Sequence, residues 1–107
     1  MNILVLKQQP LGDVLRTSAI LPGLKEKYPD CKIYWVTQKN AIDLLKYNYL
    51  IDKLLPANKS SLRKLKKKKF DLIVSLDTDK KSVSITSKLS AKKIFGTYIN
   101  NNNVTYS

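Results

Sequence analysis

Short apolar runs alternate with stretches of helical spacing along this chain, and this alternation is the feature that most restricts its fold. The runs that predict strands are residues 3–6 (ILVL), 32–37 (KIYWVT), 54–55 (LL), 72–76 (LIVSL) and 93–95 (KIF). Apolar runs without polar alternation are typical of strands buried on both faces of a sheet. The alternation of strands and helices along the chain predicts a doubly wound α/β fold, with a parallel sheet of about five strands and helices on both faces.

The chain length fits one domain over residues 1–107. With 43% hydrophobic residues, the chain can fill one packed core. The opening apolar run, Ile3 to Leu6, is far too short for a signal peptide or a membrane span, and no later run is longer. We therefore expect a cytoplasmic protein.

The stretch after the first strand predicts a helix that begins at Asp13, which would be its N-cap. The apolar positions of this helix, with one threonine, recur at helical spacing: Val14, Thr17, Leu21, Leu24 and Tyr28. Pro22 stands inside the pattern, where its ring would clash with the carbonyl of Ser18. The sequence thus predicts a kink or a break into two shorter helices.

Later segments give weaker signals. Asn40 can cap a short helix that runs through Ile42 and Leu45. Residues 59–69 predict a lysine-rich helix, and Val83 to Leu89 predict a polar one. Residues 100–103, four asparagines in a row, predict a loop.

The residue inventory excludes several kinds of chemistry. The chain has no histidine and a single cysteine, Cys31. It therefore lacks the commonest general base, the Ser-His and Cys-His pairs and most ligands for transition metals. We expect no metal site, no cofactor and no disulfide, so a general base in this chain has to be an aspartate or a glutamate.

Chain order places three acids near one another. In a doubly wound sheet the first and fourth strands are neighbours, and ligands bind beyond their carboxyl ends. Asp13 follows the first strand, whereas Asp77 and Asp79 follow the fourth. We expect the five other acids to face away from this edge, because they lie late in helices or before strands: Glu26, Asp30, Asp43, Asp52 and Asp71.

Each of these three acids also has a purely structural explanation. From position alone, Asp13 as a helix cap is as well supported as Asp13 as a base. For Asp79 a helix cap is favoured, and Asp77 can pair with Lys80 or Lys81 at the surface.

The loop after the first strand does not carry a nucleotide-binding motif. Gly12 is its only glycine, and neither G-x-G-x-x-G nor G-x-x-x-x-G-K-S/T is present. A carboxylate at the start of the helix would also repel a phosphate there. A neutral hydroxyl group is the better ligand for this position.

The net charge of +12 predicts attraction to anions, and the charge is concentrated in one segment. Seven of the eleven residues from Lys59 to Lys69 are basic. A solvated helix face is the favoured explanation, followed by contact with an anionic membrane. Nucleic acid is the weakest, because the run has no aromatic residues for base stacking.

The stretch LGDVLRTSAILPGLKEKYPD, preceded by NILVLK and followed by KIYWVT, resembles the start of glycosyltransferase family 9, the heptosyltransferases of lipopolysaccharide synthesis. The similarity continues through NYLIDKLLP, KFDLIVSLD and AKKIFGTY, in the same order and over nearly the whole chain. The resemblance implies a GT-B enzyme of two Rossmann-like domains, of which the N-terminal one binds the acceptor. The C-terminal domain binds the sugar nucleotide, commonly ADP-heptose, and transfer inverts the anomeric centre without a metal.

Residue roles follow from the same resemblance. The aspartate of the G-D pair after the first strand is the proposed base in this family, which corresponds to Asp13, and Gly12 belongs to the same motif. By position, the candidates for contacting an anionic glycolipid or oligosaccharide acceptor are Lys7, Arg16, Thr17, Asp77 and Asp79. We expect the chain to be the N-terminal, acceptor-binding domain without the C-terminal nucleotide-sugar domain, and to be inactive alone, since transfer requires both substrates to be held together.

Two other functions remain open from the sequence. One is a stand-alone Rossmann-like domain that binds a phosphorylated or nucleotide ligand without chemistry. The other is a basic accessory domain that binds a membrane or nucleic acid through Lys59 to Lys69. For the transferase, the same basic segment would give a peripheral contact with the inner membrane.

Overall fold

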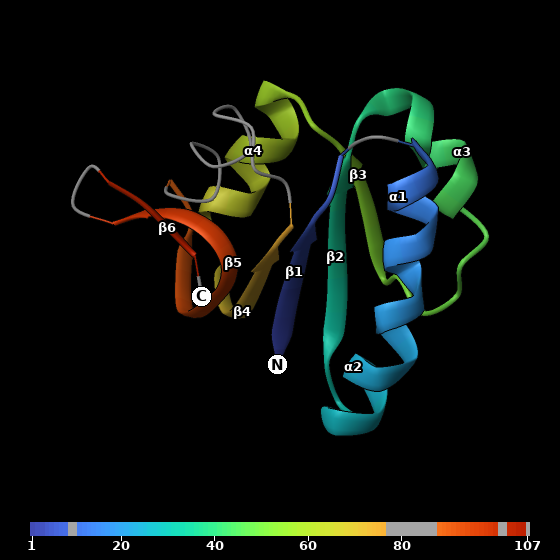
Figure 1. The fold of residues 1–107 in the computed structure, drawn as a ribbon, viewed down its shortest axis with the longest axis horizontal. Coiled ribbons are helices and arrows are strands. Elements are labelled where there is room, and N and C mark those ends of the chain that lie inside the picture. Colours follow the sequence, from blue (N-terminus) through green and yellow to red (C-terminus); the bar gives the residue numbers. More distant parts are fainter. Residues whose placement is uncertain (9–10, 77–87, 101–102, 107) are drawn as a thin grey trace.

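The computed structural model shows one sheet with helices on both faces (Figure 1). It describes residues 1–8, 11–76, 88–100 and 103–106. The strands are β1 (Asn2–Leu6), β2 (Lys32–Thr37), β3 (Lys53–Pro56), β4 (Lys69–Ser75), β5 (Ser90–Asn100) and β6 (Asn103–Tyr106). The α-helices are α1 (Leu11–Thr17), α2 (Leu21–Lys27), α3 (Ile42–Leu45) and α4 (Lys59–Lys66), and the 3₁₀ helices are η1 (Ser18–Ile20) and η2 (Lys39–Ala41).

The strand order is β3-β2-β1-β4-β5-β6, so the chain starts in the middle of the sheet, runs to one edge and returns to the other side of β1. Strands β1 to β5 are parallel to their neighbours, and β6 is antiparallel to β5. The predicted Rossmann-like α/β sheet of five parallel strands is confirmed. The sixth strand was not predicted. The asparagine run predicts a loop, but its first residue, Asn100, ends β5 and its last, Asn103, begins β6, whereas residues 101–102 lie outside the described residues.

Successive residues of the central strands point into two separate cores, which explains why the strands read as unbroken apolar runs. Ile3 and Val5 of β1 face the core under α1, α2 and α3. Leu4 and Leu6 face the core that α4 covers with Leu65. Figure 1 shows α1, α2 and α3 on one side of the sheet and α4 on the other, so the prediction of helices on both faces is confirmed.

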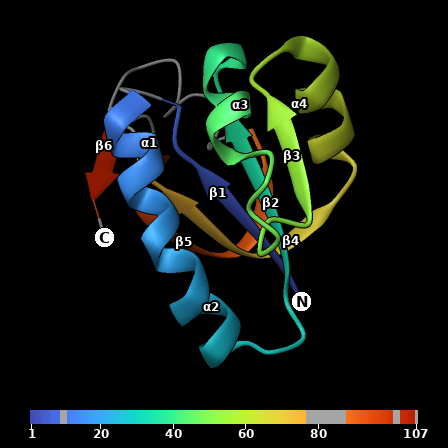
Figure 2. The ribbon, with the colours of Figure 1, turned by 90° about the vertical axis from the view of Figure 1, so that its right-hand side faces the viewer.

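The helix after β1 is interrupted where Pro22 enters. The chain forms α1, then η1, then α2, with Pro22 in the first turn of α2. A proline fits there because the first turn of a helix needs no hydrogen bond from its N–H. Figure 2 shows α1 and α2 stacked end to end along the sheet, and the predicted break into two shorter helices is confirmed.

Two predicted helix caps are wrong. Asp13 is the third residue of α1 and lies in its first turn, so it is not the N-cap. Asn40 lies in the 3₁₀ turn η2, and the residue before α3 is Ala41, whose side chain makes no cap hydrogen bond. In both places the chain turns helical earlier than expected. Of the helix predicted over residues 83–89, all but Lys88 and Leu89 lies outside the described residues.

Two of the remaining acids are structural. Asp52 accepts hydrogen bonds from the N–H of Ile33 (2.7 Å) and from Lys25 Nζ (3.0 Å). Partial burial raises the pKa of Asp52, but these two bonds, together with the positive charges of Lys25 and Lys32, outweigh it and leave the pKa below its ordinary value. Asp71 accepts from the N–H of Asn2 (2.8 Å), and this bond lowers the pKa of Asp71.

These two acids lie at the amino ends of β3 and β4, away from the carboxyl edge, as expected. Asp43 corrects that expectation, because it lies in the first turn of α3, the helix that follows the carboxyl end of β2. Its carboxylate is 3.3 Å from Lys46 Nζ and its side chain is exposed.

Candidate functional site at the carboxyl ends of β1 and β4

Strands β1 and β4 are direct neighbours, as predicted for the first and fourth strands of a doubly wound sheet. They form the switch point of the sheet, where the order of the strands changes direction. Leu6, the last residue of β1, pairs with Ser75, the last residue of β4. The N–H of Leu76 donates to the carbonyl of Leu6 (3.1 Å). The chain therefore leaves both strands at the same edge, and α1 begins from that edge.

The segment between β1 and α1 is anchored to the end of β2. The N–H of Lys7 donates to the carbonyl of Val36 (3.3 Å). The carbonyl of Lys7 accepts a hydrogen bond from Nε1 of the fully buried Trp35 (3.1 Å). Thr37 Oγ1 donates to the carbonyl of Gln8 (3.4 Å). Core packing of Trp35 thus fixes the direction in which the chain approaches the candidate site.

Buried polar side chains gather at this edge, and the sequence analysis did not identify them. Thr37 and Ser75 are fully buried, and Gln8 is nearly so. Thr37 is the last residue of β2, Ser75 is the last residue of β4, and Gln8 lies two residues after β1. These three strands are adjacent in the sheet. The sequence contains a pattern that could have predicted them, since each of these polar residues stands at or just after the end of an apolar run. The carboxyl edge of the sheet is therefore lined by polar groups beneath its surface.

Asp13 lies at this edge with its side chain 45% exposed, so solvent and ligands can reach its carboxylate. Its Oδ1 is 3.1 Å from Nη2 of Arg16, whose side chain is 82% exposed. An exposed pair three residues apart on a helix contributes only about 0.2–0.5 kcal/mol, so it opens at little cost. The arrangement gives an accessible carboxylate that can accept a proton from a hydroxyl group.

The remaining predicted site residues on α1, Gly12 and Thr17, lie on the same short helix as Asp13. Gly12 is exposed, and a Cβ added there would be 3.7 Å from Arg16 Nη2, an ordinary contact. Neither space nor backbone conformation therefore requires glycine at this position. Thr17, half-buried, ends α1 one turn beyond Asp13 and on the same side, roughly 6 Å further along the helix axis.

Two predicted site residues cannot be placed. Asp77 and Asp79 lie outside the described residues. Lys7 is described, and it follows β1 with a half-buried side chain. The structure therefore brings Lys7, Gly12, Asp13, Arg16 and Thr17 to one strand-to-helix connection.

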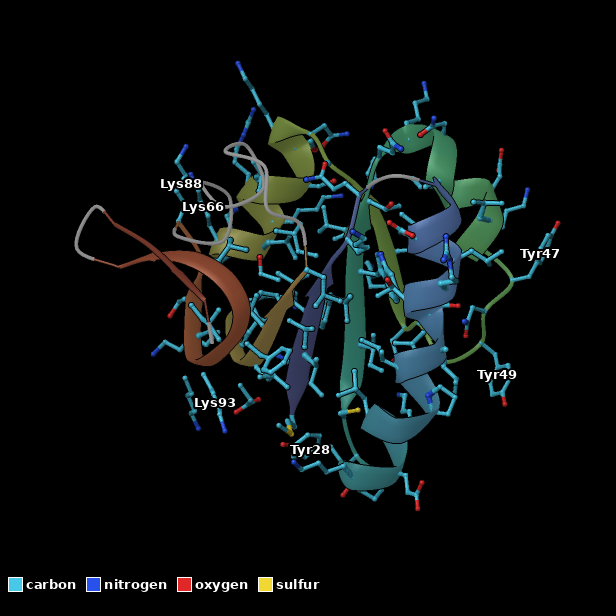
Figure 3. The ribbon with its side chains drawn as sticks, viewed as in Figure 1. Tyr28, Tyr47, Tyr49, Lys66, Lys88 and Lys93 are labelled. Atoms are coloured by element: carbon cyan, nitrogen blue, oxygen red, sulfur yellow. The ribbon has the colours of Figure 1, made fainter. Side chains whose placement is uncertain are left out.

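A hollow of about 490 Å³, here the Lys88 hollow, lies where β3 leads into α4. Its lining consists of Ala57, Asn58, Lys59, Leu62, Arg63, Lys66 and Lys88. Ala57 and Asn58 directly follow the carboxyl end of β3, so one end of the hollow lies at the same edge of the sheet as Asp13. Figure 3 shows Lys66 and Lys88 close together beside α4. Four cations and an apolar floor suit an anionic ligand with an apolar part.

The basic segment forms the predicted helix, α4. The side chain of Asn58 caps it by accepting a hydrogen bond from the N–H of Ser61 (2.8 Å). Leu65 is buried, Leu62 is partly so, and the basic side chains are exposed. Within the described part of the chain, no carboxylate forms an ion pair with a cation of α4. Among the described residues, no carboxylate therefore balances the positive charge of α4.

The described residues contain no group of three or more histidine, cysteine, aspartate or glutamate side chains that could hold a metal ion. They also contain no helix with the length and apolar character needed to cross a bilayer.

Solved structures with the same fold include two glycosyltransferases. The chain superposes on Escherichia coli heptosyltransferase WaaC with ADP at a TM-score of 0.79 and 21% identity, over 90% of this chain and 35% of that one. With WaaC bound to ADP-2-deoxy-2-fluoro heptose the TM-score is 0.74, with 20% identity over 90% and 36%. A family 9 glycosyltransferase from Veillonella parvula matches at 0.77 and 25% identity, over 89% and 31%.

These matches confirm the resemblance to glycosyltransferase family 9 and the glycosyltransferase-like α/β fold. No protein-family model matches the sequence, and no curated protein matches it. The chain spans about a third of the length of the solved structures that it resembles.

Proposed function

We propose that this chain is the acceptor-binding domain of an inverting, metal-independent glycosyltransferase, with Asp13 as the general base. The observation that carries the proposal is the exposed carboxylate of Asp13 at the switch point of a fold shared with a heptosyltransferase. Asp13 would accept the proton of an acceptor hydroxyl as its oxygen attacks the anomeric carbon of the donor sugar. The bond from that carbon to the nucleotide breaks, and the configuration inverts.

The donor would be a nucleotide sugar, with ADP-heptose favoured because WaaC was solved with ADP and with a fluorinated ADP-heptose. The first turn of α1 is a poor site for a diphosphate, since Asp13 places a negative charge there. We therefore assign this chain to the acceptor and the donor to a second domain of the kind that GT-B enzymes carry.

The acceptor would be an anionic glycolipid or oligosaccharide of the lipopolysaccharide type. One end of the Lys88 hollow lies at the same edge of the sheet as Asp13, and the hollow presents four cations, so it can hold an acidic group of the acceptor. Lys7, Arg16 and Thr17 are the candidates for contacts nearer the reacting hydroxyl. Gly12 would let the acceptor approach the backbone closely.

A cytoplasmic location with peripheral contact at the inner membrane fits this proposal. The exposed cations of α4 and of the following turn, between Lys59 and Lys69, would supply the contact with anionic lipid. Nucleic acid is disfavoured, because Tyr47 and Tyr49, the most exposed aromatic side chains among those the structure describes, lie on the opposite side of the molecule from Lys66 (Figure 3).

The base assignment can be tested in a chimera in which this chain replaces the segment of the Veillonella parvula enzyme on which it superposes. Asp13→Asn should lower kcat by about 10²- to 10⁴-fold with little change in acceptor KM. Glu26→Gln, an exposed acid in the last turn of α2, is the matched control and should leave kcat unchanged. A chimera that binds both substrates but transfers no sugar with Asp13 present would contradict the assignment.

The purified chain alone should not transfer sugar. With ADP-heptose and a lipid A or core oligosaccharide acceptor, we expect no turnover, because a single domain of this kind holds only one of the two substrates. Turnover by residues 1–107 alone would show that the donor site is also present in this chain.

A further inference from the structure

A second hollow, here the edge hollow, lies beside the C-terminal end of α4 and shares no lining residue with the Lys88 hollow. Its volume is about 350 Å³, within the range of small-ligand sites. Three apolar or aromatic residues lie among its lining, Tyr34 of β2, Leu55 of β3 and Leu65 of α4. Four lysines complete the lining: Lys53, Lys64, Lys67 and Lys68.

The floor of the edge hollow is held in place by packing. The ring of Tyr34 meets the ring of the buried Phe70 edge to face, with centroids 5.5 Å apart and an angle of 81°. Lys68 Nζ lies 5.4 Å from the centroid of the Tyr34 ring. Leu65 is 1% exposed and Tyr34 only 8%. The floor is therefore a fixed surface rather than a gap between mobile side chains.

The rim of the edge hollow concentrates positive charge from three parts of the chain. Lys53 comes from β3, Lys64 from α4, and Lys67 and Lys68 from the turn before β4. All four are exposed, and the lining includes no carboxylate. Lysine ammonium groups gathered in this way repel one another, and an anion between them removes that repulsion.

We propose that the edge hollow binds the phosphomonoester headgroup of a membrane lipid, with the phosphate among the lysine ammonium groups and the adjoining apolar part of the lipid against Tyr34, Leu55 and the aliphatic stems of the lysines. A phosphomonoester carries a charge of about −1.5 to −2 and three acceptor oxygens, which matches several converging ammonium groups better than the single charge of a phosphodiester. The proposal rests on the proposed membrane contact of α4 and gives that contact a preferred lipid.

The test is co-sedimentation of the chain with two kinds of phosphatidylcholine vesicle. One contains phosphatidic acid and the other phosphatidylglycerol, matched in total negative charge. The wild-type chain should bind the phosphatidic acid vesicles severalfold more tightly. The double variant Lys53→Gln, Lys68→Gln should lose this preference while still binding both vesicles through the other cations. Each charge removed lowers the affinity for both kinds of vesicle by about fivefold through general electrostatics. The measured quantity is therefore the ratio of the affinity for phosphatidic acid vesicles to that for phosphatidylglycerol vesicles.

The double variant Lys39→Gln, Lys93→Gln is the matched control, because it also removes two charges and both lysines are exposed and line neither hollow. This variant should keep the preference, and thermal melts should show that all variants are folded. Equal binding of wild type to both vesicles, or a preference that survives in the Lys53→Gln, Lys68→Gln variant, overturns the proposal but leaves the membrane contact standing. Binding to neither vesicle overturns the membrane contact itself.

A third arm distinguishes the lipid from free phosphate. Inorganic phosphate should displace the chain from phosphatidic acid vesicles only at concentrations far above that of the lipid phosphate, because it offers the lysines a similar charge but nothing to the apolar floor. Displacement by low concentrations of inorganic phosphate would show that the edge hollow takes the free anion and would overturn the lipid assignment.

Discussion

Replacing Asp13 by asparagine separates the two explanations of this carboxylate, one structural and one chemical. The change removes the charge and keeps the shape, and asparagine caps helices as well as aspartate does. In the described structure Asp13 has one interaction partner, Arg16, and lies in the first turn of α1. Its contribution to folding is therefore limited to the ion pair and to the helix dipole.

Both contributions are small at an exposed site. The pair accounts for about 0.2–0.5 kcal/mol and the dipole for about 0.3–1 kcal/mol. Asp13→Asn should thus lower the free energy of unfolding by about 0.5–1.5 kcal/mol, or the melting temperature by roughly 3–9 °C for a domain of this size. The measurement is urea unfolding of the wild type and the variant, at low and at high salt.

Arg16→Gln and the double variant complete a cycle that isolates the pair, whose coupling energy should be below about 0.5 kcal/mol. Glu26→Gln is the control of opposite sign, because Glu26 lies in the last turn of α2 and opposes the helix dipole there. A loss above about 3 kcal/mol in Asp13→Asn would mean that the carboxylate has a structural role the contacts do not reveal, and would refute this reasoning.

Three further substitutions have defined outcomes. Gly12→Ala should raise stability by up to about 1 kcal/mol, because the added Cβ meets nothing closer than 3.7 Å, and a loss of acceptor binding in the same variant would show that the ligand approaches the backbone there. Leu65→Ala should cost about 2–5 kcal/mol in urea unfolding, because Leu65 anchors α4 in the core, and a cost below 1 kcal/mol would contradict that packing. Because the pKa of Asp52 is lowered in the folded chain, the folded state binds fewer protons than the unfolded state, so stability should hold above about pH 4 and fall below it. Asp52→Asn should lose stability at neutral pH, by about 1 kcal/mol or less for so exposed a group, and should fall less steeply with acid; an unchanged acid profile would contradict the assignment.

The architecture was predictable because a single physical pattern determines it. Strands buried on both faces must be apolar throughout, so each of them is visible in the sequence, and the break at Pro22 follows from its missing N–H. The neighbouring positions of β1 and β4 followed from the winding rule alone. Because Asp13 follows β1, the same rule also predicted that Asp13 lies at the carboxyl edge of the sheet.

The details that failed depend on where each helix begins. Asp13 looked like a cap because Gly12 resembles a loop residue, yet Gly12 is already helical in α1. Asn40 failed as a cap for a similar reason, since a 3₁₀ turn begins at Lys39. Helix starts of this kind differ by small energies that local sequence does not resolve.

The two hollows beside α4 could not be predicted, because they depend on tertiary contacts. The edge hollow joins Lys53 to Lys68, which lie fifteen residues apart on different elements. In the sequence this region was only a run of charge, for which a solvated helix face was the favoured explanation. The apolar floor of Tyr34, Leu55 and Leu65 forms only when β2, β3 and α4 pack together.

The most direct test of the acceptor-binding assignment is a chemical-shift map of the ¹⁵N-labelled chain, titrated separately with a lipopolysaccharide core oligosaccharide and with ADP. The oligosaccharide should shift amide signals in α1 and at Ser75 and Leu76, where β1 and β4 release the chain, whereas ADP should leave them in place. Strong shifts from ADP at that edge, with none from the oligosaccharide, would contradict the account and favour a nucleotide-binding domain.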